Sequence, residues 1–99
     1  MENDSRLGDL ANLVGIDLDS PEQRRAAELV RGDREFLAAL VKVRKDRGLT
    51  QEDVATRLGV TQPTVAAFER HESDPKLSTL RRYAQAVEAL VTHVVVADS

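Results

Sequence analysis

The sequence predicts an all-α protein of five main helices, with an extra helical segment before them and one short β-strand after them. Three observations lead to this prediction. Aromatic residues make up only 3% of the 99 residues, so the core must be built from Leu, Val and Ala, a composition that favours helices over a β-sandwich or barrel. Apolar residues recur at helical spacing between capping residues and glycines. The last residues, by contrast, are β-branched and continuous.

Residues 1–32 are expected to form an acidic helical extension. A short amphipathic helix fits residues 4–14. A second helix is expected to begin at Ser20, a helix cap that is followed by Pro21 at the first helical position, and to end at Gly32. The first thirty residues contain seven acidic and three basic side chains, whereas the remainder contains ten and eleven. The acidity of the chain, whose net charge is −3, therefore lies mainly in this extension.

Residues 33–90 are expected to form the central helical domain, which capping residues divide into its helices. Thr50 and Asp53 have the spacing of a capping box, and Thr61 has the position of an N-cap. Pro63 is tolerated in the first turn of the helix that follows, because no interior hydrogen bond is lost there. The expected helices span residues 33–48, 50–58, 61–70 and 77–89.

The tail, residues 91–99, changes character, since its β-branched run is typical of a strand. One strand in a helical chain leaves its backbone groups unpaired, and the simplest relief is pairing with the same strand of a second copy. We therefore expect dimerisation through tail residues Val91, His93, Val94, Val95 and Val96. The alternative is that these residues extend the last helix or fray.

The most informative stretch, residues 50–69, predicts two short helices joined by a tight turn. A steep crossing of two helices needs a small side chain, which Ala55 provides, and the turn needs a positive φ, which suits Gly59. The inner face of the pair is apolar and consists of Val54, Leu58, Val60, Val65 and Phe68. The outer face of the second helix carries short or planar groups that can approach base edges, namely Gln62, Thr64 and Ala67.

Residues 33–87 resemble the Xre-like helix-turn-helix family, which includes lambdoid phage repressors and Cro proteins. The resemblance depends on residues at family spacing, namely Arg44, Gly48, Leu49, Thr50, Gln51, Ala55, Gly59, Val60, Thr61, Val65, Glu69 and Pro75. One departure is His71, which stands where the family often has Gly. The resemblance implies a five-helix repressor-like fold and a function in binding double-stranded DNA.

The resemblance also implies roles for single residues. Gln62 would be the principal base reader, because its amide can pair with adenine N6 and N7. Thr64 would contact a base edge or a phosphate, and Ala67 would lie against a thymine methyl group or touch nothing. Gln51 would hold a phosphate at a helix N-terminus. Thr61 would cap the recognition helix and also touch a phosphate.

Two further sets of charged residues are candidates, one for a structural role and one for binding phosphates. Arg44 and Glu69 resemble the family's buried pair, which is structural. The recognition helix has no Lys or Arg of its own, so phosphate-binding charge must come from its surroundings, and the candidates are Arg70, Lys76 and Arg81. For each candidate the alternative is an ordinary solvated surface charge.

The sequence gives no support for an enzyme, a metal site or a cofactor. It has no cysteine, and His71 and His93 stand apart without a spaced set of carboxylates. Glu52 and Asp53 are adjacent in a predicted first turn, where acids usually serve the helix dipole. No apolar run is long enough to span a membrane, and the acidic N-terminus is unlike a signal peptide, so we expect a cytoplasmic protein.

Three functions remain open. The first is an autoregulatory repressor that binds an inverted repeat as a homodimer, with half-sites about 34 Å apart. The second is an antitoxin, because the tail is similar to that of HigA-type antitoxins; such a protein would repress its own operon and bind a toxin, with residues 1–30 as the candidate surface. The third is a protein-interaction module that has lost DNA contact.

Overall fold

The computed structural model describes residues 20–98. The chain divides into two compact units, residues 1–33 and 34–99. In the described part of the first unit, Ser20 accepts a hydrogen bond from the backbone N–H of Gln23 (3.1 Å) and opens a helix whose side chains are exposed up to residue 33. The expected helix at 4–14 lies outside the described residues, and the domain boundaries at 32 and 90 stay a prediction.

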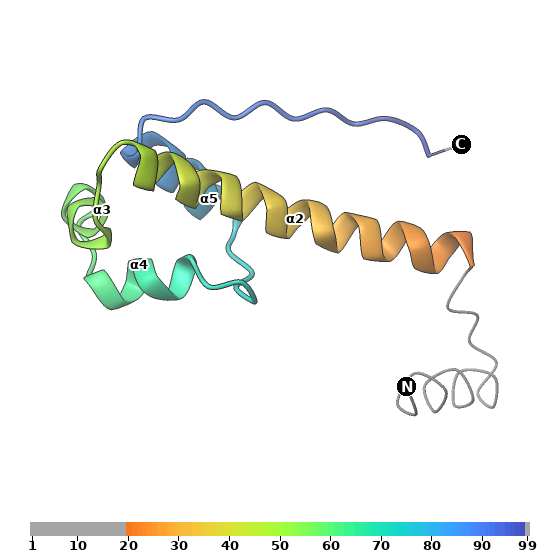
Figure 1. The fold of residues 1–99 in the computed structure, drawn as a ribbon, viewed down its shortest axis with the longest axis horizontal. Helices are drawn as coiled ribbons and strands as arrows, with labels where there is room; N and C mark the ends of the chain where they lie inside the picture. Colours follow the sequence, from red (N-terminus) through yellow and green to blue (C-terminus); the bar gives the residue numbers. More distant parts are fainter. Residues whose placement is uncertain (1–19, 99) are drawn as a thin grey trace. The chain divides into compact units, whose positions relative to one another are not determined.

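The described residues form four helices and no strand (Figure 1). Their bounds are α2 (Pro21–Asp46), α3 (Gln51–Leu58), α4 (Gln62–Phe68) and α5 (Leu77–Ala86). The prediction of an all-helical fold agrees with this structure. The prediction of five main helices and a C-terminal β-strand is wrong on both counts.

The helix count is wrong because α2 continues through Gly32, where two helices were expected. A glycine in a helix interior costs only about 1 kcal/mol relative to alanine, and the residues around Gly32 are mostly good helix formers. Gly48 and Gly59 behave differently, since their φ values are +70° and +69°. A glycine therefore ends a helix here only where the next turn requires the left-handed region.

The strand prediction is wrong because the described part of the chain offers the tail no partner strand. Residues 89–98 form neither helix nor strand, and no second strand exists among the described residues. A strand needs a neighbour to satisfy its backbone N–H and C=O groups, whatever its side-chain preference. Val94, Val95 and Val96 are instead 79–93% exposed.

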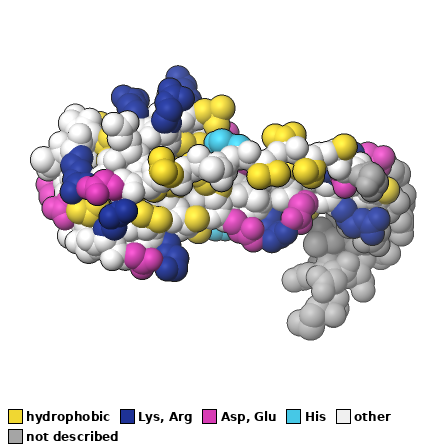
Figure 2. All heavy atoms as spheres, turned by 90° about the horizontal axis from the view of Figure 1, so that it is seen from above, with side chains coloured by type: hydrophobic (Ala, Val, Ile, Leu, Met, Phe, Trp, Pro, Cys, Tyr) yellow, Lys and Arg dark blue, Asp and Glu magenta, His cyan; other side chains and the backbone are white. Residues whose placement is uncertain are grey.

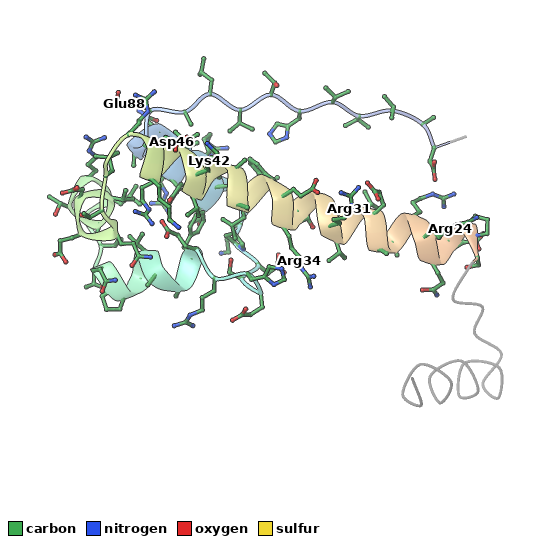
Figure 3. All side chains as sticks on the ribbon, in the orientation of Figure 1. Arg24, Arg31, Arg34, Lys42, Asp46 and Glu88 are labelled. Atoms are coloured by element: carbon green, nitrogen blue, oxygen red, sulfur yellow. The ribbon has the colours of Figure 1, made fainter. Side chains whose placement is uncertain are left out.

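Helix α5 ends at Ala86, three residues earlier than expected, in a turn held by two arginines. Glu88 has a φ of +61°, and it is the one non-glycine residue among those described with a positive φ. Arg57 Nη1 donates to the carbonyl of Ala86 (2.6 Å), and Arg47 Nη2 donates to the carbonyl of Glu88 (2.9 Å). Figure 3 labels Glu88 at this turn. The arginines supply donors to carbonyls that a helix end leaves without a partner.

The core of the second unit joins its four helices. Its buried residues are Leu40, Val54, Ala55, Val65, Tyr83, Ala84 and Val87. Phe68 stacks on Tyr83 with ring centroids 4.6 Å apart, which fixes α4 against α5. Val60, expected in this core, is 42% exposed in the turn between α3 and α4. No helix within residues 20–98 is both long and apolar enough to cross a bilayer.

Candidate nucleic-acid interface

Local capping fixes the geometry of the α3–α4 pair. Thr50 and Asp53 form a complete capping box, in which each side chain accepts a hydrogen bond from the other residue's backbone N–H (3.0 and 2.8 Å). The hydrogen bond from the Thr50 backbone N–H lowers the pKa of Asp53 below its usual value. Gly59 then takes the left-handed conformation, and Thr61 caps α4. The start of α3 and the turn between the two helices are thereby specified by residues close to them in the sequence.

A buried ion pair lies beneath the end of α4. Arg44 Nε and Nη2 donate to the carboxylate of Glu69 at 2.7 and 3.0 Å, and these two side chains are 9% and 6% exposed. Arg44 Nη1 also donates to the carbonyl of Leu49 (2.7 Å). The pair therefore ties α2 to the residue that ends α4.

The carboxylate of Glu69 is ionised in this setting. Burial alone would raise its pKa, but hydrogen bonds from Arg44, Tyr83 and Gln51 outweigh burial and hold the pKa below its usual value. The hydrogen bond to Glu69 in turn raises the pKa of Arg44. Both partners are charged near neutral pH.

Tyr83 is a member of this site that the sequence reasoning missed. Its hydroxyl donates to Glu69 Oε2 (2.5 Å), and burial together with this bond raises its pKa. On α5, Ala84 and Val87 are buried in the core and Leu80 packs against it. Tyr83 lies at helical spacing from Leu80 and Val87, so the same periodicity contained the signal.

The two glutamines expected to contact DNA are in contact with each other. Gln51 Nε2 donates to Glu69 Oε1 (2.9 Å), and Gln62 Nε2 donates to Gln51 Oε1 (2.6 Å). Both glutamines are half-buried, and each occupies the first position of its helix, α3 or α4. One hydrogen-bonded chain thus runs from the buried Arg44–Glu69 pair to Gln62. The glutamine chain, as we call it, comprises Glu69, Gln51 and Gln62.

The other residues expected to read bases or hold phosphates lie along or after α4. Thr61 and Thr64 are exposed, and their hydroxyl oxygens are 2.8 Å apart. Ala67 is half-buried. Arg70 and Lys76 are exposed in the segment between α4 and α5. The contacts of these residues with DNA stay predictions.

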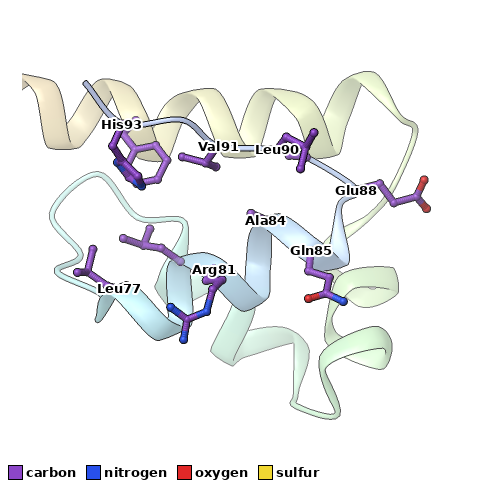
Figure 4. Close-up of a pocket in the computed structure, with 11 residues that line it drawn as sticks. Leu77, Arg81, Ala84, Gln85, Glu88, Leu90, Val91 and His93 are labelled. Carbon is purple, nitrogen blue, oxygen red and sulfur yellow. The ribbon is translucent and has the colours of Figure 1, made fainter. Parts of the chain in front are cut away.

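Arg81 lies on α5, and its contact with a phosphate stays a prediction. It lines a groove of about 640 Å³ on α5, together with Phe36, Ala84, Val91 and His93 (Figure 4). No hydrogen bond or ion pair within residues 20–98 joins Arg70, Lys76 or Arg81 to the glutamine chain. Basic and acidic side chains both lie on the face drawn in Figure 2. That face is therefore not uniformly basic.

The residues expected to dimerise divide into two sets. Val91 packs against the core, and the ring of His93 meets Phe36 edge-on at 5.9 Å between centroids. Val94, Val95 and Val96 are exposed. Their role in dimerisation stays a prediction. Among residues 20–98, no three His, Asp or Glu side chains are grouped so that they could hold a metal ion.

Comparison with known proteins relates this geometry to a family. A family model described as helix-turn-helix matches residues 40–88, which include the glutamine chain, the buried pair and the turn. Antitoxin HigA1 of Mycobacterium tuberculosis is 43% identical over 86 residues, which are 87% of this chain and 56% of that protein. The chain thus spans little more than half the length of this relative.

Other relatives match a shorter stretch of the chain. An uncharacterized HTH-type transcriptional regulator of Methanothermobacter thermautotrophicus is 46% identical over 44 residues, 44% of this chain and 64% of that protein. Antitoxin HipB of Escherichia coli is 32% identical over 54 residues, 54% of this chain and 57% of that protein. No solved structure gives a significant match. Residues 40–88 of this chain are a helix-turn-helix domain and belong to that family.

Proposed function

We propose that the chain is a sequence-specific DNA-binding transcriptional regulator, and not an enzyme, that places α4 in the major groove. The observation that carries this proposal is Gln62, which stands at the start of α4 with its amide held by Gln51. In helix-turn-helix proteins the second helix enters the major groove, and its N-terminal residues meet the base edges. Thr64 is exposed one position beyond Pro63 and is the second base-reading candidate.

Phosphate contacts would fix the position of α4 on the duplex. The backbone N–H groups at the N-terminus of α3, beside Gln51, are one proposed phosphate-binding group. The exposed side chains of Thr61, Arg70 and Lys76 are the others. The proposed binding should weaken as salt rises, because each phosphate contact releases counterions. Such a regulator works in the cytoplasm.

A homodimer on an inverted repeat completes the proposal. Two-fold symmetric helix-turn-helix dimers read half-sites about one helical turn of DNA apart. The tail is proposed to contribute an apolar surface to the dimer interface, formed by the exposed Val94, Val95 and Val96. Truncation after Leu90 should give a monomer by sedimentation. A dimer that survives the truncation would place the interface elsewhere in the chain.

The proposed function is tested by selecting genomic fragments that bind at physiological salt, with Gln62→Ala selected in parallel. We expect the unmodified chain to enrich an inverted repeat, and Gln62→Ala to lose about 1–3 kcal/mol of discrimination at each of one or two base positions. Gln51→Ala should weaken binding to every sequence, because it removes a phosphate contact. No enrichment with either chain would refute DNA reading and favour a protein-interaction role.

A second candidate, an operon-repressing antitoxin, is favoured by the extent of the similarity to HigA1. That similarity covers 86 of the 99 residues, whereas the helix-turn-helix match covers only residues 40–88. Only 11 residues follow residue 88, too few to account for the rest of the similarity. It must therefore include much of the segment before residue 40. We propose that residues 1–30 bind a toxin encoded beside this gene.

The antitoxin proposal is tested by co-expression. The full chain should relieve growth inhibition caused by the product of the neighbouring gene, and a chain that starts at residue 31 should not. Operator binding by the shortened chain serves as the control for folding. Relief of inhibition by the shortened chain would exclude residues 1–30 as the toxin-binding segment.

A further inference from the structure

We infer that Glu69 sets the base preference of the protein by fixing, through Gln51, which way the amide of Gln62 faces. Glu69 is thus a positioning residue for base reading as well as one half of a buried ion pair. This inference rests on the proposed function, in which Gln62 contacts a base edge. It follows from the chemistry of three consecutive hydrogen bonds.

The first step is the direction of the hydrogen bond between Glu69 and Gln51. An ionised carboxylate has acceptor oxygens and no donor. The Gln51 atom that lies 2.9 Å from Glu69 Oε1 must therefore be the nitrogen. Arg44 and Tyr83 also donate to this carboxylate and hold it in place. The orientation of the Gln51 amide is consequently dictated from within the core.

The second step passes this direction to Gln62. With its nitrogen committed to Glu69, Gln51 can offer only its oxygen to Gln62. The Gln62 atom 2.6 Å away must therefore be a donor, Nε2. This leaves Gln62 with a free Oε1 and one remaining N–H of Nε2. The outward edge of the base reader thus has one acceptor and one donor.

The third step compares this edge with the bases. Adenine shows a donor at N6 and an acceptor at N7 in the major groove, which match one acceptor and one donor. Guanine shows two acceptors, O6 and N7, so one of them would face Gln62 Oε1 without a hydrogen bond. The glutamine chain therefore favours adenine over guanine.

The alternative orientation shows why Glu69 is needed. If both amides were reversed, Gln51 would donate to Gln62 Oε1, and both N–H groups of Gln62 would be free to meet the two acceptors of guanine. The two amides alone allow either orientation with the same geometry. Among the side chains of residues 20–98, the carboxylate of Glu69, which cannot donate, is the group that excludes the reversed one.

The test measures the ratio of affinities for two operators that differ only by A·T or G·C at the position identified with Gln62→Ala. In Glu69→Gln the side chain can present either an oxygen or a nitrogen to Gln51, so the adenine-over-guanine ratio should fall at least about fivefold. Gln51→Met interrupts the chain and leaves the Arg44–Glu69 pair intact, and it should lower the ratio similarly. This second variant keeps the test decisive if Glu69→Gln does not fold.

The matched control is Arg47→Ala, which removes an exposed ion pair with Glu88 after α5 and touches no member of the glutamine chain. It should lower stability without changing the ratio. A ratio unchanged in both Glu69→Gln and Gln51→Met, while Gln62→Ala still abolishes the base preference, would overturn this inference and leave the proposed function standing. An unmodified chain that enriches no operator would overturn both.

Discussion

The ends of α4 and α5 are both held by arginines that reach a glutamate from another part of the chain, yet the two ends differ in environment. At the end of α4, the side chains of Arg44 and Glu69 are 9% and 6% exposed. At the end of α5, the side chains of Arg47, Arg57 and Glu88 are between 42% and 63% exposed. A buried charge depends on its partner, whereas an exposed charge has water as a substitute. The end of α4 should therefore be rigidly specified and the end of α5 tolerant of change.

The largest effect is expected from Arg44→Ala. This variant leaves the carboxylate of Glu69 buried without its cation, and the free energy of unfolding should fall by about 3–5 kcal/mol in a urea titration. Lys42→Ala is the control on the same helix. Lys42 pairs with Asp46 at 2.6 Å, both side chains are well exposed (Figure 3), and the loss should be about 0.5 kcal/mol or less. Similar losses in both variants would contradict the proposed distinction.

The second largest loss of stability is expected from acid, which should act on the end of α4. The folded-state pKa of Glu69 lies below its usual value of 4.5, so its ionised form stabilises the fold fully above that pH. As the pH falls below 4.5 toward the lowered pKa, this stabilisation is lost. Urea midpoints measured from pH 6 to pH 3 should show the decline. In Glu69→Gln that part of the pH dependence should be absent; an unchanged acid profile would mean that other carboxyl groups cause it.

Smaller effects are expected at the end of α5. Glu88→Gly removes exposed ion pairs but allows the positive φ without strain, and its backbone carbonyl still accepts from Arg47. The two effects oppose each other, and we expect a net stabilisation of up to about 1 kcal/mol by thermal unfolding. A marked loss of stability would show that the carboxylate of Glu88 is needed.

A small effect is also expected from Arg47→Ala. Its ion pair with Glu88 has a 3.7 Å separation and both side chains are well exposed, so the loss should be at most about 1 kcal/mol. Raising the salt concentration should shrink the difference from the unmodified chain, because salt screens exposed charges. A loss as large as that of Arg44→Ala would show that the two helix ends are equally constrained.

The same contrast explains what could be predicted from the sequence. The features around α3 and α4 depend on neighbours in the chain: the capping box at Thr50, the left-handed Gly59 and the cap at Thr61 each need only the next few residues. Two other features do not depend on sequence neighbours alone. They are the continuation of α2 through Gly32 and the failure of the tail to form a strand. The first depends on whether a turn must follow, and the second on whether a partner strand exists.

The site shows the same limit. Residue types and spacing indicated Gln51, Gln62, Arg44 and Glu69 as members of the motif. The bonds that join them into one chain cross separations of 11 to 25 residues, and local patterns carry no information about them. Tyr83 could be placed on the buried face of α5 by periodicity, but its hydroxyl partner on α4 could be found only in three dimensions.

The bond between Gln62 and Gln51 bears on how this protein could acquire a new operator. A replacement of Gln62 alone leaves Gln51 Oε1 without its donor, so the old preference is lost before the new side chain has gained support. A switch of operator should therefore proceed by paired replacements at positions 51 and 62. Duplicated copies that diverge would need two substitutions to separate their targets, and for that reason a single mutation should rarely create cross-regulation between them.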